Sequence, residues 1–261
     1  MAGQVRFFDA VDPFNLTDWE PQNGPSPSRT KQRAQCLSKH GNELMHTQFG
    51  TQDSGTIVYK AKKATGFLTV PNVGLVSNGW HIDSWTVTYA QKDYVSLSLN
   101  VHKHIDGTVD ANCRQYAPTF KVPAVLVGCP TSIPAATGTG TVFALTSNAV
   151  VGVRGIVLSM GLNHVDEDAA NGDHFASDNY DGSETIQVDF CGDVDPEADY
   201  TLNSDWTDDT FAKNQGNTVA TTSSLTASHH VANVEGTGTT EYEDEDDEDD
   251  DDEDDDDEDA T

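Results

Sequence analysis

Histidine and carboxylate side chains at alternate positions are the residues of this chain that could do metal chemistry. His102 and His104 are two residues apart, and Asp106 follows at the next such position. In a strand, side chains two residues apart point to the same side, so this run can present two imidazoles and a carboxylate to one ion. The same residues also suit an ordinary solvated strand face running into a turn, and we favour that interpretation. A second group allows the same two interpretations: His164, Asp166 and His174.

Two acidic stretches could supply the oxygen ligands that calcium prefers. They are the group Asp178, Asp181 and Glu184 and the group Asp193, Asp195, Glu197 and Asp199. Neither follows the order of ligands in an EF-hand loop, so we interpret both as solvated acidic loops. We therefore expect no bound metal, no cofactor, and folding that needs no metal ion.

No stretch of the sequence matches a catalytic motif, and we expect a protein that is not an enzyme, with no catalytic or cofactor-binding residues. The glycine-rich stretch 137–141 lacks the lysine of a phosphate-binding loop, which favours a plain loop. The cysteines are far apart and form no Cys-x-x-Cys pair, which favours reduced, mostly buried thiols over disulfides or zinc ligands. They are Cys36, Cys113, Cys129 and Cys191.

The elements that must position these residues are two long hairpins. In residues 80–105, apolar residues alternate with polar ones, which predicts two antiparallel strands. A second hairpin is expected at 150–191, with a long polar loop at 166–183 that is either functional or makes contacts. The stretch 97–106 faintly repeats in 158–166, by duplication or by chance. The predicted core includes Val95, Leu97, Leu99, Val101, Ile186, Val188 and Phe190.

The predicted fold is mainly β: an antiparallel sandwich or barrel built on long hairpins. Residues 1–55 are expected to form an irregular N-terminal arm with one possible short helix at 29–47, and residues 56–192 the β domain. Residues 193–240 read as a polar, loosely ordered extension, and 241–261 as a disordered acidic tail.

Charge is distributed very unevenly along the chain. The net charge is −30, and between residues 241 and 259 every residue except Tyr242 is acidic. Residues 1–154 carry 13 basic and 10 acidic residues, whereas residues 155–240 carry 1 and 16. This asymmetry argues against nucleic-acid binding by the acidic half and leaves contact by the basic first third open. We expect no sequence-specific nucleic-acid binding.

No apolar run could cross a bilayer, and the N-terminus lacks the apolar core of a secretory signal. We therefore expect a soluble protein that is made in the cytoplasm and has no membrane partner.

Three roles remain open for the acidic tail. It could be a solubility tether, a mask that mimics nucleic acid, or an electrostatic latch. The latch would hold a basic surface of this same chain, made by Arg29, Lys31, Arg33, Lys60, Lys62 and Lys63.

A hairpin-rich chain with an aromatic N-terminal arm, long Asp/Asn/Gly loops and no active site resembles the virion structural proteins of tailed bacteriophages. The two hairpins, 80–105 and 150–191, are similar in layout to those of tail-tube subunits. In that family paired sheets form a barrel, and subunits form rings whose arms and loops contact the next ring. The acidic tail departs from that pattern, and a capsid-decorating or tail-accessory protein fits nearly as well.

The resemblance implies a non-enzymatic structural subunit of a phage particle, assembled in the host cytoplasm and located in the virion. Its expected partners are copies of itself, through β-sheet and loop contacts, and other virion proteins. The alternative is an acidic-tailed binding protein or chaperone that shields a basic partner. A hydrolase or metalloenzyme with an unrecognised site ranks last.

Overall fold

The computed structural model describes residues 13–23, 28–39, 43–105, 113–146, 152–169, 174–192, 199–214, 222–232 and 234. The predicted acidic tail, Asp106 and the stretch 193–198 lie outside these ranges. All secondary structure in the described ranges is strand, apart from turns and single helical-turn residues, which confirms the mainly β prediction.

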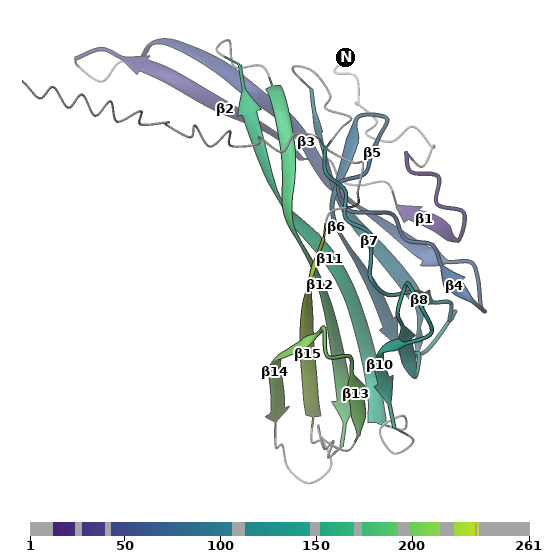
Figure 1. The fold of residues 1–261 in the computed structure, drawn as a ribbon. Helices are drawn as coiled ribbons and strands as arrows, with labels where there is room; N and C mark the ends of the chain where they lie inside the picture. Colours follow the sequence, from purple (N-terminus) through teal and green to yellow (C-terminus); the bar gives the residue numbers. More distant parts are fainter. Residues whose placement is uncertain are drawn as a thin grey trace, which may run out of the picture.

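The strands form one large antiparallel sheet and two small ones (Figure 1). The large sheet has the order β1-β3-β7-β6-β11-β12-β15-β14, with β2 paired to β3 and β5 to β6; the small sheets are β13-β10-β9 and β4-β8. The bounds are β1 Trp19–Asn23, β2 Ser28–Leu37, β3 Glu43–Ala61, β4 Phe67–Leu68, β5 Val76–Ser77, β6 Trp80–Ala90, β7 Asp93–His104, β8 Val122–Pro123, β9 Ser132–Pro134, β10 Thr141–Leu145, β11 Val153–Asp168, β12 His174–Cys191, β13 Tyr200–Leu202, β14 Thr207–Asn214 and β15 Thr222–Val231.

The two predicted hairpins are β6–β7 and β11–β12, and they lie side by side because β6 also pairs with β11. Leu99 of β7 lies opposite Trp85 of β6, and Trp85 in turn lies opposite Met160 of β11. Directly opposed residues project to the same face, so these rows build one continuous apolar surface. All seven core residues expected from the alternation are at most 1% exposed.

The small sheets cover this apolar surface, which gives the molecule two layers. Ile133 of β9 and Phe143 of β10 are buried in the same core cluster as Leu97 of β7. Phe120 meets the ring of Trp85 edge-on, with centroids 6.1 Å apart. The arrangement is that of an antiparallel sandwich with one layer much larger than the other.

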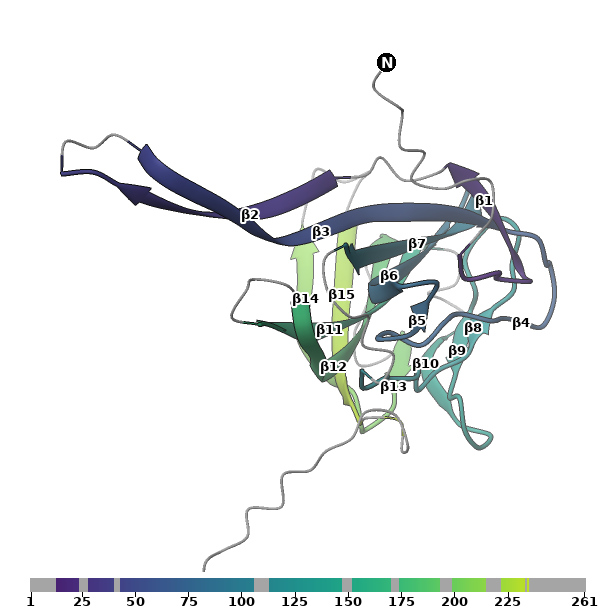
Figure 2. The same ribbon diagram turned by 90° about the horizontal axis from the view of Figure 1, so that it is seen from above.

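The predicted helix at 29–47 is wrong, because residues 29–37 belong to β2 and residues 43–47 to β3. Ser28 pairs with Ser54 and the ladder continues to Leu37 opposite Glu43. β3 is 19 residues long, and its second half pairs with β7 in the main sheet. This pairing fixes the second half of β3 as a strand, and the first half continues in the same conformation. Figure 2 shows this β2–β3 ribbon projecting well beyond the rest of the sheet.

The main sheet continues past residue 192, into the segment for which the sequence suggests a loose extension. β15 pairs with β12 along ten residues, from Thr222 opposite Cys191 to Val231 opposite Gly182. Leu225 and Ala227 of β15 are fully buried in the common core. The sequence of β15 does not show the alternation of a strand clearly, because it consists mostly of Ser, Thr, Ala and His. Its few apolar residues are small or isolated.

Most of the predicted loop at 166–183 is also strand, because β11 runs to Asp168 and β12 starts at His174. In β12, buried Ser177 and Asn179 are flanked by exposed Phe175 and Tyr180. The polar composition suggested a loop, but here the polar residues are the buried ones.

Two β-bulges lie where the hairpins separate. In β6, Asp83 is an extra residue between the pairs Ile82–Val101 and Ser84–Asn100. In β12, Asp181 has a φ of 50° at a register shift, two residues from the pair Ser183–Gly161. The last pair joining β6 to β11 is Ser84 with Gly161, so both bulges sit next to the point at which the hairpins part. Bulges increase the local twist, which lets the distal ends of the two hairpins follow separate paths.

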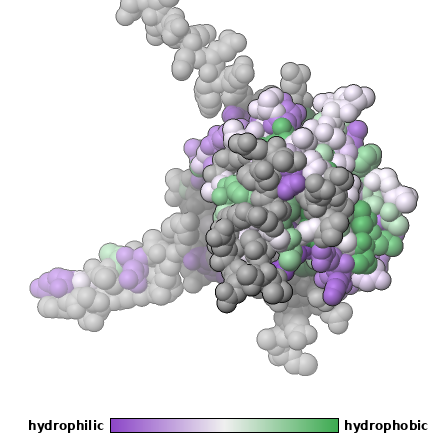
Figure 3. All heavy atoms as spheres, turned by 90° about the horizontal axis from the view of Figure 1, so that it is seen from below, coloured by the Kyte–Doolittle hydropathy of each residue, from purple (hydrophilic) through white to green (hydrophobic). Residues whose placement is uncertain are grey.

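The described surface is mostly hydrophilic or neutral in the view from below (Figure 3). Hydrophobic side chains gather at the right of that view, the side on which Figure 1 places β4, and Phe67 of β4 is substantially exposed.

Candidate metal centre

Four potential metal ligands from the two hairpins meet beyond the last β6–β11 pair. His102 and His104 are two residues apart on β7, and His164 and Asp166 are two residues apart on β11. Each pair therefore shares one face of its strand. One ligand atom from each of these four residues lies within 4.8 Å of the others. We call these four residues the His–Asp cluster.

The closest contacts of the His–Asp cluster converge on one carboxylate oxygen. Oδ1 of Asp166 is 2.6 Å from Nε2 of His164 and 3.1 Å from Nε2 of His104. Among the described residues, Nε2 of His104 has no partner with hydrogen-bond geometry, despite its short distance to Asp166. Nε2 of His102 likewise has no partner there, although His102 is only 4% exposed. Leaving a buried polar atom unpaired costs about 1–3 kcal/mol, so this arrangement needs an explanation.

A second layer of acceptors fixes the orientation of two of the imidazoles. Nδ1 of His102 is 2.5 Å from Oδ1 of Asp83, the bulge residue of β6. Nδ1 of His164 is 2.6 Å from Oδ1 of Asn179, its register partner on β12. An acceptor at Nδ1 of His102 holds the proton on that nitrogen and leaves its Nε2 with a free lone pair. His164 has an acceptor at each nitrogen, since Nε2 also donates to Asp166, and its Nε2 lone pair becomes free only when that proton leaves.

Further buried side chains enclose the cluster. The ring of His81 stacks on His102 with centroids 4.7 Å apart, and the ring of His174 stacks on His104 at 3.7 Å. Nε2 of His174 is 2.9 Å from the Ser177 hydroxyl, which donates to Oδ1 of Asp166 at 3.0 Å. The rings cover the imidazole side of the centre, while the Asp166 side chain is 31% exposed.

Electrostatics favour a neutral His81 and an ionised Asp166. Burial, and then the neighbouring histidines, lower the pKa of His81 to about 3. Burial alone would raise the pKa of Asp166, but the imidazoles of His104 and His164 outweigh it and hold that pKa well below its usual range. Burial also opposes protonation of His164, whose hydrogen bonds to Asp166 and Asn179 nevertheless raise its pKa. The site therefore combines a carboxylate with imidazoles whose protonation depends on it.

The preferred interpretation of His102 and His104 as a solvated strand face is wrong, since both are buried. The structure joins the two histidine groups that the sequence singled out separately, with His174 stacked against the ligand set and Asp106 outside the described residues. Sequence reasoning missed His81, Asp83 and Asn179. The faint repeat between 97–106 and 158–166 was the available signal, since each copy contains two residues of this cluster.

The predicted acidic stretches do not come together in the described part of the chain. Glu184 is fully buried and accepts hydrogen bonds from the Thr119 amide at 2.7 Å and from the Thr119 hydroxyl. Asp181 is exposed in the bulge, and of the second stretch only Asp199 is described. The four-residue His–Asp cluster is the one such ligand group found in the described residues.

The glycine-rich stretch 137–141 is the exposed connection from β9 to β10, as expected of a loop. No disulfide links the four cysteines, all of which lie in described ranges. The expectation of mostly buried thiols holds for Cys113 only, because Cys36 is exposed and the other two are half-buried.

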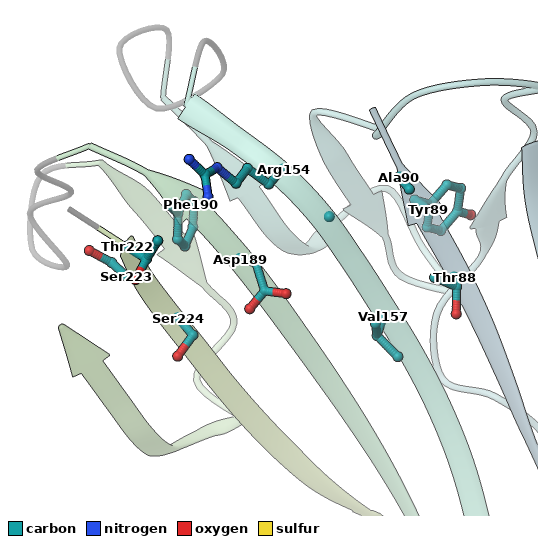
Figure 4. A pocket seen from close by; sticks show the side chains of 11 residues that line it. Thr88, Tyr89, Ala90, Arg154, Val157, Asp189, Phe190, Thr222, Ser223 and Ser224 are labelled. Atoms are coloured by element: carbon teal, nitrogen blue, oxygen red, sulfur yellow. The ribbon is translucent and has the colours of Figure 1, made fainter. Parts of the chain in front are cut away.

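A hollow of about 520 Å³ lies at the opposite end of the central hairpins (Figure 4). Its lining includes Arg154 of β11, Asp189 of β12 and Ser224 of β15. Gly155 in its wall is nine residues from His164 along β11, which is about 30 Å of strand. The hollow is therefore separate from the His–Asp cluster. The guanidinium of Arg154 donates a hydrogen bond to Cys191 Sγ rather than to the carboxylate of Asp189 in the lining.

The fold and the site together define an all-antiparallel β protein with a centre of largely buried imidazoles and one partly exposed carboxylate. Comparison with protein-family models and with curated protein sequences finds no match to the chain. Within the residues that the structure describes, no helix is long and apolar enough to span a bilayer.

Proposed function

We propose that this chain is a non-enzymatic structural subunit that assembles with copies of itself through β-sheet and loop contacts, as in a phage particle. A tail-tube-like subunit is the favoured form of this proposal. The observation that carries it is the projecting β2–β3 ribbon.

The ribbon is a two-stranded structure over most of its length. β3 pairs with β7 only from Gln52 to Lys60, whereas its ladder with β2 extends out to Glu43. Among the described strands, none pairs with the outer edges of residues 43–50 and of the facing part of β2, whereas the Thr51 carbonyl still accepts a hydrogen bond from the Ile105 amide. An isolated two-stranded hairpin is marginally stable in water, and its open edges accept a further strand. A ribbon of this length is therefore best explained by a partner that completes it.

The root of the ribbon is anchored to the sheet by an ion pair. The Arg29 guanidinium contacts both carboxylate oxygens of Asp53, at 2.5 and 2.7 Å. Asp53 is buried and lies opposite Lys103 of β7. A bidentate pair fixes direction as well as distance, which favours a ribbon presented at a defined angle to its partner.

A second candidate contact surface lies on the distal part of the β11–β12 hairpin. Val165, Phe175 and Tyr180 are exposed there, and Phe175 reaches 69%. Exposed large apolar side chains on one hairpin favour a protein contact. This surface lies within the stretch 166–183 or directly beside it, where contacts were expected from the sequence.

The proposal is tested by shortening the ribbon. Gln32 faces Phe49, so replacing residues 33–48 with Asn-Gly closes a two-residue hairpin at that pair. We expect the full chain to form rings or tubes in negative-stain images and a large species in light scattering, and the shortened chain to stay monomeric. A chain lacking 14 residues of the tail, 248–261, loses the same length and should still assemble.

Two outcomes would contradict the proposal in different ways. If the full chain stays monomeric at every salt and protein concentration, self-assembly fails and the alternative of an acidic-tailed binding protein takes first place. If the shortened chain assembles as well as the full chain, the ribbon is not the contact.

A further inference from the structure

We propose that His102, His104, His164 and Asp166 bind one divalent transition-metal ion, with zinc as the best fit, and that this ion ties the first hairpin to the second. The proposal concerns the free subunit and does not depend on whether that subunit assembles.

The spacing of the donors suits one small ion. Ligand atoms of a tetrahedral zinc site with bonds of about 2.0–2.1 Å are about 3.3 Å apart. The donor atoms of the His–Asp cluster all lie within 4.8 Å of one another, and the shortest of the contacts to Asp166 is 2.6 Å. The required distance falls between these values, so small side-chain rotations are enough to form the site.

The second-layer contacts prepare the imidazoles for a metal. Asp83 at Nδ1 of His102 and Asn179 at Nδ1 of His164 hold a proton on each Nδ1, so Nε2 is the nitrogen of each ring that can bind a metal. Nε2 of His102 has no proton to lose, whereas Nε2 of His164 gives up the proton that it shares with Asp166 when the ion binds. A carboxylate or an amide oxygen behind a ligating histidine is the usual support of a metal-bound imidazole.

The unpaired Nε2 of His102 is an independent observation. It is buried and lacks a hydrogen-bond partner within the described residues, whereas the buried Nε2 of His104 has only the ion-pair contact of 3.1 Å to Asp166. A metal ion at the centre of the cluster would satisfy Nε2 of His102 and would also be within reach of Nε2 of His104 beside Asp166. The Asp166 side chain is 31% exposed, which gives the ion a path to the site.

The donor set selects the class of metal. Three imidazole nitrogens and one carboxylate suit zinc and its late first-row neighbours, whereas calcium and magnesium require sites built from oxygen. Four protein ligands leave no open position on a tetrahedral ion, which is the pattern of a structural rather than a catalytic zinc site.

The position of the site indicates what the ion would do. Two ligands come from β7 and two from β11, on hairpins that no longer pair with each other at this level. His102 and His104 of β7 face Ser54 and Gln52 of β3, where the ribbon leaves the sheet. A bound ion would cross-link the hairpins beside the root of the ribbon, where backbone pairing between them has ended.

The test uses the purified full chain after treatment with a chelator. Cobalt(II) titration should produce the intense visible bands of a tetrahedral nitrogen–oxygen site at one ion per chain, and zinc should displace them. Cobalt held by the carboxylates of the acidic tail is octahedral and absorbs weakly, so the spectrum separates the two kinds of binding. Zinc should also raise the melting temperature of the treated chain.

Variants assign the ligands. His104→Gln and His164→Gln should abolish the cobalt bands, and Asp83→Asn should weaken zinc binding by about 10–100-fold at unchanged stoichiometry. His230→Gln, at an exposed histidine of β15, is the matched control and should bind like the native chain. If a histidine variant fails to fold, Asp166→Asn replaces it.

The proposal is overturned if the native chain gives no tetrahedral cobalt spectrum, or if zinc affinity is the same in the native chain and in the folded ligand variants. Either result can occur whether or not the subunit assembles.

Discussion

The carboxyl group of Glu184 should make the stability of this protein fall as the pH rises. Glu184 lies on β12 between Met160 of β11 and His229 of β15, and it is completely buried. Burial raises its pKa from 4.5 to about 7, although the two hydrogen bonds from Thr119 partly oppose that change. Replacement by Gln keeps the size of the side chain and removes the titration.

The direction follows from which state binds the proton. Below about pH 4.5 the carboxyl group is protonated in both the folded and the unfolded chain, and its contribution to stability is fully present. Between 4.5 and about 7 the folded chain keeps the proton that the unfolded chain loses, so each step upward in pH favours unfolding. Above this range both states are ionised and the loss is complete.

The magnitude follows from the two pKa values. At about 1.4 kcal/mol for each pH unit between 4.5 and about 7, the native chain should lose about 3 kcal/mol relative to Glu184→Gln. Other groups titrate in the same range, so the useful quantity is the difference between the two proteins. Urea unfolding followed by tryptophan fluorescence at pH 4.5, 6 and 8 measures it, since Trp85 and Trp206 are buried.

The matched control is Glu20→Gln, the same substitution at an exposed position of β1. It should leave the pH dependence of the native chain nearly unchanged. A constant stability difference between the native chain and Glu184→Gln from pH 4.5 to 8, or a difference that changes in the opposite direction, would refute the reasoning.

Two further predictions concern the core and the tail. Leu99→Ala should reduce the free energy of unfolding by about 2–5 kcal/mol, because Leu99 is fully buried between Ile57 and Trp85; a loss below about 0.5 kcal/mol would place it outside the core. A chain ending at Thr240 should assemble more readily than the full chain in light scattering, most clearly at low salt, because a latch of 18 acidic residues would be removed and charge is screened over about 8–10 Å at physiological ionic strength. Equal assembly of both chains at all salt concentrations would exclude the latch.

Local alternation was sufficient to predict the central hairpins. Val95 to Val101 and Ile186 to Phe190 alternate without interruption, and the period of a strand fixes which residues are buried. The β2–β3 ribbon could not be predicted in this way. Its few apolar residues, Leu37, Leu44 and Met45, allow a helical pattern, and its strand conformation depends on the continuation of β3 into the sheet.

The cluster was visible in the sequence only as separate halves. The spacing of His102 and His104 suggested a shared strand face, but their meeting with His164, sixty residues later, depends on how β6 and β11 pair. Asp83 carried no signal because it is the extra residue of a bulge, which interrupts the alternation on which the prediction rests. The polar composition of 166–183 predicted an exposed loop, but Ser177 and Asn179 in this stretch are buried in a strand.

The two bulges suggest how the cluster could have been gained by an existing fold. Ile82 and Trp85 are both buried across the first bulge, and Asn179 and Gly182 are both buried across the second. Each extra residue is therefore accommodated in the bulge, and the residues on either side of it keep the same side chains facing the core. A one-residue insertion in each hairpin could thus redirect the distal ends while leaving the apolar rows below unchanged.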